Sequence, residues 1–278
     1  MKWRNVGQLR AAVMAGLSEF RSADADCVVG VPRSGLIPAT FVASYLNLPL
    51  SAPQSFVNGQ TWWKWRGVDH TREGIRRVLV IDDSLNTGGS LNEAARMVES
   101  VGVEAVRAAV YGRTDSVQTG AADIVLQAID GDRLFEWNLW KHSILGKTIF
   151  DMDGVLCRDP RPEENDDGPL YQKFIAGAEP LFIPCRPILA VCTSRLEKYR
   201  SETLAWLERN GVRFGALIMS QHETKEARVK ARDHADMKAA FYSRSKAALF
   251  VESNRGQAAK IARIAGRPVV SVEGMELL

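Results

Sequence analysis

Short apolar runs alternate with amphipathic stretches along this chain, and the alternation predicts an α/β fold. The apolar runs have the length of strands, and the stretches between them have the length of helices. In the first half, the predicted strands are Cys27–Val31, Arg77–Ile81, Ala105–Tyr111 and Asp123–Ile129. The predicted helices of the same half are Val6–Ser22, Leu36–Leu46 and Ser90–Val101.

The pattern starts again in the second half, which predicts a second domain. The predicted strands there are Lys147–Asp151, Ile188–Cys192, Ala216–Met219, Ala248–Val251 and Pro268–Ser271, with a helix at Leu196–Asn210. A chain of 278 residues is long enough for two domains. We place the boundary within His142–Gly146, which gives two Rossmann-like domains at residues 1–145 and 146–278.

Composition and charge exclude several classes of protein. Hydrophobic residues make up 46% and charged residues 25%, as in ordinary globular proteins. Lys and Arg number 36 against 33 Asp and Glu, so sequence-independent binding to nucleic acid is not predicted. No segment has the apolar length of a signal peptide or a membrane span. The four cysteines lack metal-binding spacing, which favours reduced thiols and a cytoplasmic location.

One segment has the sequence of a phosphate-binding loop. The predicted strand before Asp82 and Asp83 is followed by a Thr-Gly-Gly-Ser turn and a predicted helix. Such a turn directs backbone N–H groups to one point at the positive end of the helix, where a phosphate binds well. The two aspartates can accept hydrogen bonds from ribose hydroxyls. The expected phosphate ligands are Thr87, Gly88, Gly89 and Ser90.

A second turn, after the strand at Val28, has the same strand–turn–helix form and carries Arg33, Ser34 and Gly35. The two turns resemble the phosphoribosyl-diphosphate (PRPP) loop and the diphosphate loop of type I phosphoribosyltransferases. The resemblance implies that Asp82–Ser90 binds PRPP and that Arg33 with the Ser34 and Gly35 N–H groups contacts the leaving diphosphate.

The same family has a flap and a hood that select the acceptor, and tryptophans mark both regions here. Residues 53–75 are polar and interrupt the alternation, and we expect the flap at Phe56–Glu73. Flap and hood residues expected to meet diphosphate or acceptor are Trp63, Lys64, Trp65, Arg66, Arg72 and Trp137. An aromatic face can stack on a base or a sugar ring. The alternative is that these tryptophans, with Trp62 and Trp140, only pack on one another.

The second domain opens with an Asp-x-Asp-Gly sequence directly after an apolar strand. Asp151, Asp153 and Gly154 resemble the nucleophile motif of haloacid-dehalogenase (HAD) phosphatases. The resemblance implies that Asp151 is the nucleophile and that Asp153 is the acid and base. It also implies that Asp151, Asp153 and Glu252 hold Mg²⁺, which prefers oxygen ligands.

Other elements of the HAD resemblance follow in order. Thr193 ends an apolar strand and is the expected phosphate ligand, and Lys238 is the expected lysine, with Lys246 as the alternative. Asn254 stands where the family usually has a second acid, which weakens the expected metal set. The intervals around Thr193 are too short for a full cap domain, so a minimal cap is predicted.

The order of the two motifs resembles the dual-domain ribofuranosyltransferases of bacterial surface-polysaccharide assembly. That resemblance implies transfer of 5-phosphoribose from PRPP to a glycan, such as a lipid-linked oligosaccharide, followed by removal of the 5-phosphate. One alternative is a nucleobase phosphoribosyltransferase joined to a nucleotidase, and another is a PRPP sensor that regulates a phosphatase. The acceptor, the anomer, the oligomeric state and any peripheral membrane association stay open.

Overall fold

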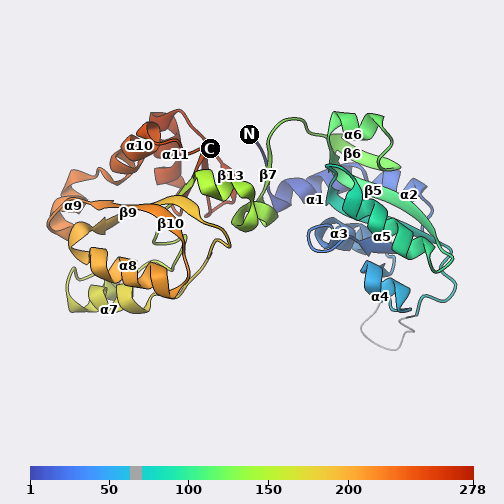
Figure 1. The fold of residues 1–278 in the computed structure, drawn as a ribbon, viewed down its shortest axis with the longest axis horizontal. Helices are drawn as coiled ribbons and strands as arrows, with labels where there is room; N and C mark the ends of the chain where they lie inside the picture. The colour runs from blue at the N-terminus through green and yellow to red at the C-terminus, as the bar shows by residue number, and fades with distance from the viewer. Residues whose placement is uncertain (63–70) are drawn as a thin grey trace. The chain divides into compact units, whose positions relative to one another are not determined.

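The computed structural model describes residues 1–62 and 71–278 and divides the chain into two compact units. Unit 1 is Met1–Trp137 and unit 2 is Asn138–Leu278, so the division falls a few residues before His142–Gly146. Figure 1 shows that each unit has its own sheet flanked by helices.

Unit 1 is built on a five-stranded parallel sheet with the strand order β3-β2-β4-β5-β6. The strands are β2 (Cys27–Gly30), β3 (Leu50–Ser51), β4 (Arg77–Ser84), β5 (Glu104–Gly112) and β6 (Ile124–Ala128). Alternate residues of β4 point to opposite faces. Leu79 and Ile81 pack in the core on one face, whereas Val78 and Val80 pack in the core on the other.

Helices cover both faces of this sheet. They are α1 (Val6–Ala15), α2 (Leu17–Ser22), α3 (Leu36–Leu46), α4 (Pro53–Val57), α5 (Gly89–Glu99) and α6 (Thr114–Gln118). Helices α1 to α3 belong to the core on one face, and α4 and α5 belong to the core on the other. A separate pair of short strands, β1 (Lys2–Arg4) and β7 (Arg133–Phe135), is parallel. The first residues of the chain therefore lie beside residues close to the C-terminal end of unit 1.

Two expectations for unit 1 need correction. The single helix predicted at Val6–Ser22 is two helices, interrupted at Gly16, where the side chain of Leu126 packs against the glycine backbone. The flap was expected to begin at Phe56, but Phe56 lies in α4 and is fully buried. An aromatic ring of that size is stabilised by burial in the core, so it cannot belong to an exposed flap.

Unit 2 has a six-stranded sheet with the order β10-β9-β8-β11-β12-β13, parallel except for β13. The strands are β8 (Thr148–Phe150), β9 (Ile188–Leu196), β10 (Phe214–Ser220), β11 (Leu249–Glu252), β12 (Val269–Ser271) and β13 (Glu276–Leu277). The central strand β8 therefore lies between β9 and β11, and its carboxyl end is flanked by the ends of both neighbours.

The helices of unit 2 follow its strands in sequence. The α-helices are α7 (Pro169–Gly177), α8 (Arg200–Arg209), α9 (Lys225–Ala231), α10 (His234–Arg244) and α11 (Arg255–Ala265). Short 3₁₀ helices are η1 (Glu136–Lys141, which spans the division between the units), η2 (Ser143–Lys147), η3 (Pro162–Glu164) and η4 (Glu197–Tyr199). Helices α10 and α11 pack on one face of the sheet over Ile149 and Phe250. Within the described residues, no helix is long and apolar enough to cross a membrane.

Candidate functional sites

The first candidate site, here called the loop site, lies at the carboxyl ends of β2 and β4 and comprises Arg33–Gly35 and Asp82–Ser90. Strand β4 continues to Ser84, so both aspartates are in the strand rather than after it. Gly88 precedes α5, and α5 begins at Gly89, so the expected phosphate turn leads directly into the N-terminus of a helix. Ligands of open α/β sheets bind at this edge.

The two turns of the loop site lie against each other. The backbone N–H of Val31 donates to Ile81 O at 2.9 Å. A Cβ atom added to Gly35 would lie 2.7 Å from both Ile81 O and Val31 O, so only glycine allows this approach. The close contact brings the expected diphosphate loop beside the expected PRPP loop. The Arg33 guanidinium donates from Nη2 to Trp137 O at 2.9 Å.

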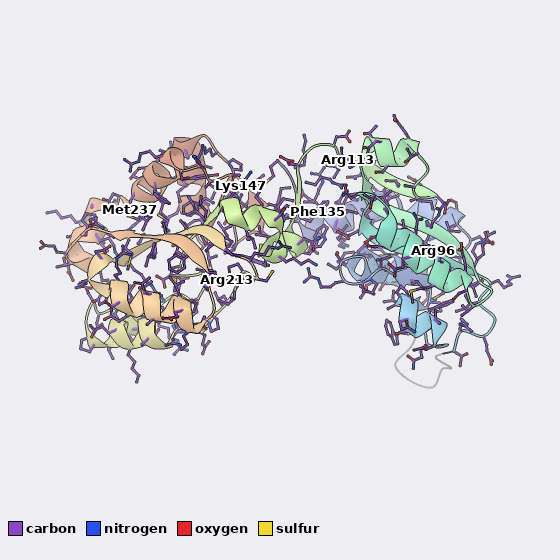
Figure 2. All side chains as sticks on the ribbon, in the orientation of Figure 1. Arg96, Arg113, Phe135, Lys147, Arg213 and Met237 are labelled. Carbon is purple, nitrogen blue, oxygen red and sulfur yellow. The ribbon has the colours of Figure 1, made fainter. Side chains whose placement is uncertain are left out.

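Asp83 is buried and has a partner that the sequence did not reveal. Trp137 Nε1 donates to Asp83 Oδ2 at 2.7 Å, which satisfies one carboxylate oxygen with a neutral donor. The indole stacks on Phe135 with ring centroids 5.0 Å apart, and Phe135 stacks on Tyr111 at 5.5 Å. Figure 2 labels Phe135, the middle ring of this stack. Trp137 is therefore held by ring packing while it contacts the site.

Asp82 has a strongly perturbed acidity. Burial and the neighbouring Asp83 raise the pKa of Asp82 to about 8, and its Oδ1 accepts only from the Asp83 N–H among the hydrogen bonds of the described residues. A carboxyl group in such surroundings is poorly stabilised when ionised. Hydroxyl donors from a bound sugar would stabilise the ionised form.

The turn before Thr87 is braced from two other elements. Arg133 of β7 donates from Nη1 to Leu85 O at 3.0 Å. Ser116 Oγ of α6 donates to Asn86 O at 2.8 Å. These bonds fix the backbone whose N–H groups form the expected phosphate cradle. Neither residue has a sequence signal of its own, because each acts from a distant element.

The expected flap and hood residues separate in three ways. Trp63, Lys64, Trp65 and Arg66 lie outside the described residues. Arg72 donates to Phe56 O and Val57 O, so its guanidinium is committed to the end of α4. Trp140 belongs to unit 2 and stacks on Phe182 with ring centroids 4.4 Å apart. The ring contacts of Trp140 in the described structure are with two phenylalanines of unit 2, Phe150 and Phe182.

The second candidate site, here called the carboxylate site, lies at the carboxyl ends of β8, β9 and β11. Asp151 follows β8, and its backbone N–H donates to Val251 O at 2.9 Å. Lys238 of α10 donates from Nζ to Asp151 Oδ2 and to Glu252 Oε2, both at 2.7 Å. Of the two candidate lysines, the fold therefore brings Lys238 to the acids, whereas Lys246 is exposed.

Asp153 has a cationic partner that the sequence analysis missed. Arg195 of β9, fully buried, donates from Nη2 to Asp153 Oδ1 at 2.6 Å and from Nε to Asp153 Oδ2 at 3.1 Å. This is the forked geometry in which arginine binds a carboxylate most strongly. Gly154 follows with φ +74°, and a Cβ atom there would meet Ser253 Cβ at 2.5 Å. The Asp-x-Asp-Gly turn therefore requires its glycine.

The charges of Asp151, Lys238 and Glu252 in the carboxylate site shift the pKa values of one another. Burial and the charge of Glu252 raise the pKa of Asp151 well above its usual range. Burial alone would raise the pKa of Glu252, but Lys238 lowers it. Burial alone would lower the pKa of Lys238, but Asp151 and Glu252 raise it. Lys238 therefore stays charged between the two acids.

A cavity of about 200 Å³ opens at the carboxylate site. Its lining contains Asp151, Asp153, Asp159, Pro160, Asn165, Tyr171, Thr193, Ser194, Arg228, His234, Lys238, Ser253 and Gln257. Thr193, the expected phosphate ligand, is buried and lines this cavity beside Asp151. Burial raises the pKa of Asp159, the next largest cause being Asp153. Asp159 and Arg228 were not among the expected site residues.

The expected magnesium ligands do not fit a metal ion in this arrangement. Within residues 1–62 and 71–278, no three or more His, Cys, Asp or Glu side chains are grouped to hold one. The carboxylates of Asp151 and Glu252 accept from Lys238, and that of Asp153 accepts from Arg195. Ammonium and guanidinium groups thus supply the positive charge that Mg²⁺ was expected to supply. Mg²⁺ is therefore given no role in the reaction proposed for this site.

Comparison with known proteins identifies the region around the loop site. Residues 3–118 match the family model of the phosphoribosyl transferase domain, and this segment contains both turns of the loop site. An orotate phosphoribosyltransferase from Staphylothermus marinus is 36% identical over 98 residues, which cover 34% of this chain and 45% of that protein. An adenine phosphoribosyltransferase from Mycobacterium tuberculosis is 32% identical over 113 residues, which cover 36% and 53%.

The chain spans about half the length of these curated relatives. Among solved structures, a purine phosphoribosyltransferase from Pyrococcus horikoshii covers 49% of this chain and 92% of its own, with a TM-score of 0.37 and 21% identity. By sequence, residues 3–118 are therefore similar to a phosphoribosyl transferase domain. The matched segment ends before Phe135, Trp137 and unit 2.

Proposed function

We propose that this protein makes a ribofuranoside in two steps, one in each unit. Unit 1 transfers the 5-phosphoribosyl group of PRPP to an acceptor and releases diphosphate. Unit 2 then hydrolyses the 5-phosphate. The observation that carries the proposal is the strand–turn–helix at Asp82–Ser90 inside the segment that matches the phosphoribosyl transferase family.

The geometry of the loop site supports the transfer step. Asp82 and Asp83 lie at the end of β4, where their oxygens can accept hydrogen bonds from the ribose hydroxyls. The turn Thr87–Ser90 would hold the 5-phosphate by its N–H groups. Gly35 holds the other turn against β4, beside the position that the diphosphate would occupy. The C1–O bond to diphosphate breaks as the acceptor forms its bond to C1.

The carboxylate site supports the second step as a HAD-like phosphatase. The strand order places β8 between β9 and β11, so Asp151, Thr193 and Glu252 meet at one edge. Asp151 would attack phosphorus while the bond between phosphorus and the ribose 5-oxygen breaks. Asp153 would give that oxygen its proton, and water would then release phosphate from Asp151.

A glycan hydroxyl is the acceptor that the pairing of the two units favours. A phosphatase joined to a nucleotide-forming enzyme would destroy the nucleotide, whereas a glycan that carries ribofuranose needs both steps. The Trp137 indole stacks on Phe135 and donates to Asp83, and we infer that it would meet an acceptor bound beside the ribose. Aromatic faces bind the apolar faces of sugars.

A nucleobase acceptor is the second candidate, and the relatives favour it. The curated relatives compared above are named as orotate and adenine phosphoribosyltransferases. A flat base can stack on an indole as readily as a sugar can. In that case the coupled product is a free nucleoside rather than a ribosylated glycan.

The deciding experiment uses an Asp151→Asn variant with PRPP and each acceptor class. We expect diphosphate release to continue and the product to keep its phosphate, as measured by mass spectrometry. A matched control, Asp159→Asn, changes an acid of the same cavity that is not the proposed nucleophile and should still give dephosphorylated product. A fully dephosphorylated product from Asp151→Asn would refute the assignment of unit 2. Diphosphate release with a free base and with no oligosaccharide would select the nucleoside reading.

A further inference from the structure

The carboxylate site contains Arg228, a cation that has no role in the reaction proposed above. Arg228 lies on α9 and lines the cavity with Asp151, Thr193 and Lys238. Its Nη1 donates to Ser194 O at 2.6 Å, which places the guanidinium at the end of β9. Its Nε atom is buried and has no hydrogen-bond partner.

The other strong cations at this site are already bonded to its acids. Lys238 contacts Asp151 and Glu252 at 2.7 Å each, and Arg195 forms a fork with Asp153. A phosphate monoester carries about two negative charges at neutral pH. The charge of Lys238 and Arg195 is offset by three carboxylates, so an incoming phosphate needs a further cation.

Arg228 meets that need because its own charge is not offset. Within the described part of the chain, its guanidinium forms no ion pair with a carboxylate. Ser194 Oγ and Gln257 Oε1 also line the cavity, and both are buried without partners. A polar group that is buried and unsatisfied costs free energy, which a ligand with hydrogen-bonding oxygens and hydroxyls can recover.

The start of helix α9 is bonded to a neighbouring loop of unit 2, and these bonds fix the position of Arg228 at the cavity. The Lys225 N–H donates to Asp167 Oδ2 at 2.9 Å, and the Lys225 ammonium donates to Asn165 O. Asp167 is also bonded by Lys198 and Tyr199. These bonds join the start of α9 to the loop that forms another part of the cavity wall.

We propose that Arg228 binds the phosphate dianion of the substrate and makes the carboxylate site selective for phosphate monoesters. The inference rests on the proposed phosphatase function of unit 2 and names the residue that recognises its substrate. The unpartnered Nε–H and a remaining Nη–H would donate to two phosphate oxygens, as arginine does in forked phosphate contacts.

The test measures phosphate binding directly, so it does not depend on turnover. Inorganic phosphate and ribose 5-phosphate are titrated by calorimetry into the full chain carrying Ser90→Asp, which repels phosphate from the loop site. In that background, Arg228→Gln should weaken binding of both probes at least tenfold, and Arg228→Lys should recover part of the loss. The matched control, Lys230→Gln, makes the same charge change on an exposed position of α9 and should leave binding within twofold.

Hydrolysis of ribose 5-phosphate supplies a second, separate readout. Arg228→Gln should raise KM and the inhibition constant of phosphate together, with a smaller fall in kcat. A merely structural role would instead lower kcat and thermal stability without changing the inhibition constant. Phosphate binding within twofold of the background variant in Arg228→Gln, or none in the background variant, would overturn the role of Arg228. Binding that depends on Arg228 without hydrolysis would instead overturn the phosphatase proposal.

Discussion

In the loop site, the Asp83 carboxylate accepts a hydrogen bond from an indole N–H, whereas in the carboxylate site the Asp151 carboxylate accepts one from an ammonium group. In the carboxylate site, every acid of the Asp-x-Asp-Gly turn has a cationic partner. In the loop site, the aspartates have no cationic hydrogen-bond partner among the described residues. Both sites are proposed to bind phosphate, yet the acids of one have cationic partners and the acids of the other do not.

The difference follows from what each acid is proposed to do. Acids that accept hydrogen bonds from ribose hydroxyls need neutral donors, and the phosphate beside them is held by backbone N–H groups. Acids that act directly on a phosphate would repel it, so resident cations must offset their charge. A buried ion pair is also costly to break, because the remaining charge is left unpaired. The two sites should therefore respond very differently to loss of a partner.

The largest effect is expected from Lys238→Met. The variant leaves Asp151 and Glu252 buried without their shared cation, so unit 2 should lose about 3–5 kcal/mol of stability. Hydrogen exchange in peptides from β8 and β11 during urea unfolding of the full chain measures it, and exchange in β4 should not change. Lys246→Met, at the exposed alternative lysine, is the control and should cost little. Equal losses of stability from Lys238→Met and Lys246→Met would show that the contacts of Lys238 with Asp151 and Glu252 do not stabilise unit 2.

A medium effect, of opposite sign, is expected from Asp82→Asn in unit 1. The folded pKa of about 8 exceeds the ordinary value near 4, so the folded state holds a proton that the unfolded chain releases. Stability due to this group is therefore present at low pH and is lost as pH rises from about 4 through about 8. The amide cannot ionise, so the variant should gain on the order of 2 kcal/mol at pH 8 while transfer from PRPP falls.

The control for this prediction is Asp26→Asn, since Asp26 has the opposite shift. The backbone N–H of Arg76 is the main cause that lowers the pKa of Asp26. Its contribution is present above the ordinary carboxyl pKa and is lost as pH falls, so the amide should reduce stability near neutral pH. Urea unfolding of unit 1 at several pH values compares the two variants. Parallel stability curves for Asp82→Asn and the unaltered chain would refute the perturbed acid.

The smallest effect is expected from Trp137→Phe. The substitution keeps a ring to stack on Phe135 but removes the Nε1–H donor to Asp83, so unit 1 should lose about 1 kcal/mol. Denaturant unfolding followed by exchange in β4 measures it, with Trp3→Phe, which leaves the Trp137 donor in place, as a control. A loss as large as that from Lys238→Met would show that the neutral partner matters as much as the cationic one. In that case the contrast between the two sites would fail.

Much of the local structure could be predicted from the sequence. Helix α3 has the predicted bounds, and the ends of the predicted strands differ from the observed ones by one to a few residues. The hydrophobic period and the turn residues predict these elements, because both signals depend only on residues that are close in the sequence. The largest errors are at Gly16 and Phe56. There, packing against β6 and against the sheet core overrides local preference.

The sequence by itself determined the two motif loops, because each is a continuous strand–turn–helix or strand–turn segment whose backbone geometry depends on adjacent residues. Only the tertiary structure decided which side chains neutralise or satisfy the acids. Arg195 lies 42 residues from Asp153, and Trp137 lies 54 residues from Asp83. Arg228 likewise reaches the end of β9 from α9, 34 residues after Ser194. Such pairs form only when separate strands and helices pack, so no local pattern in the chain records them.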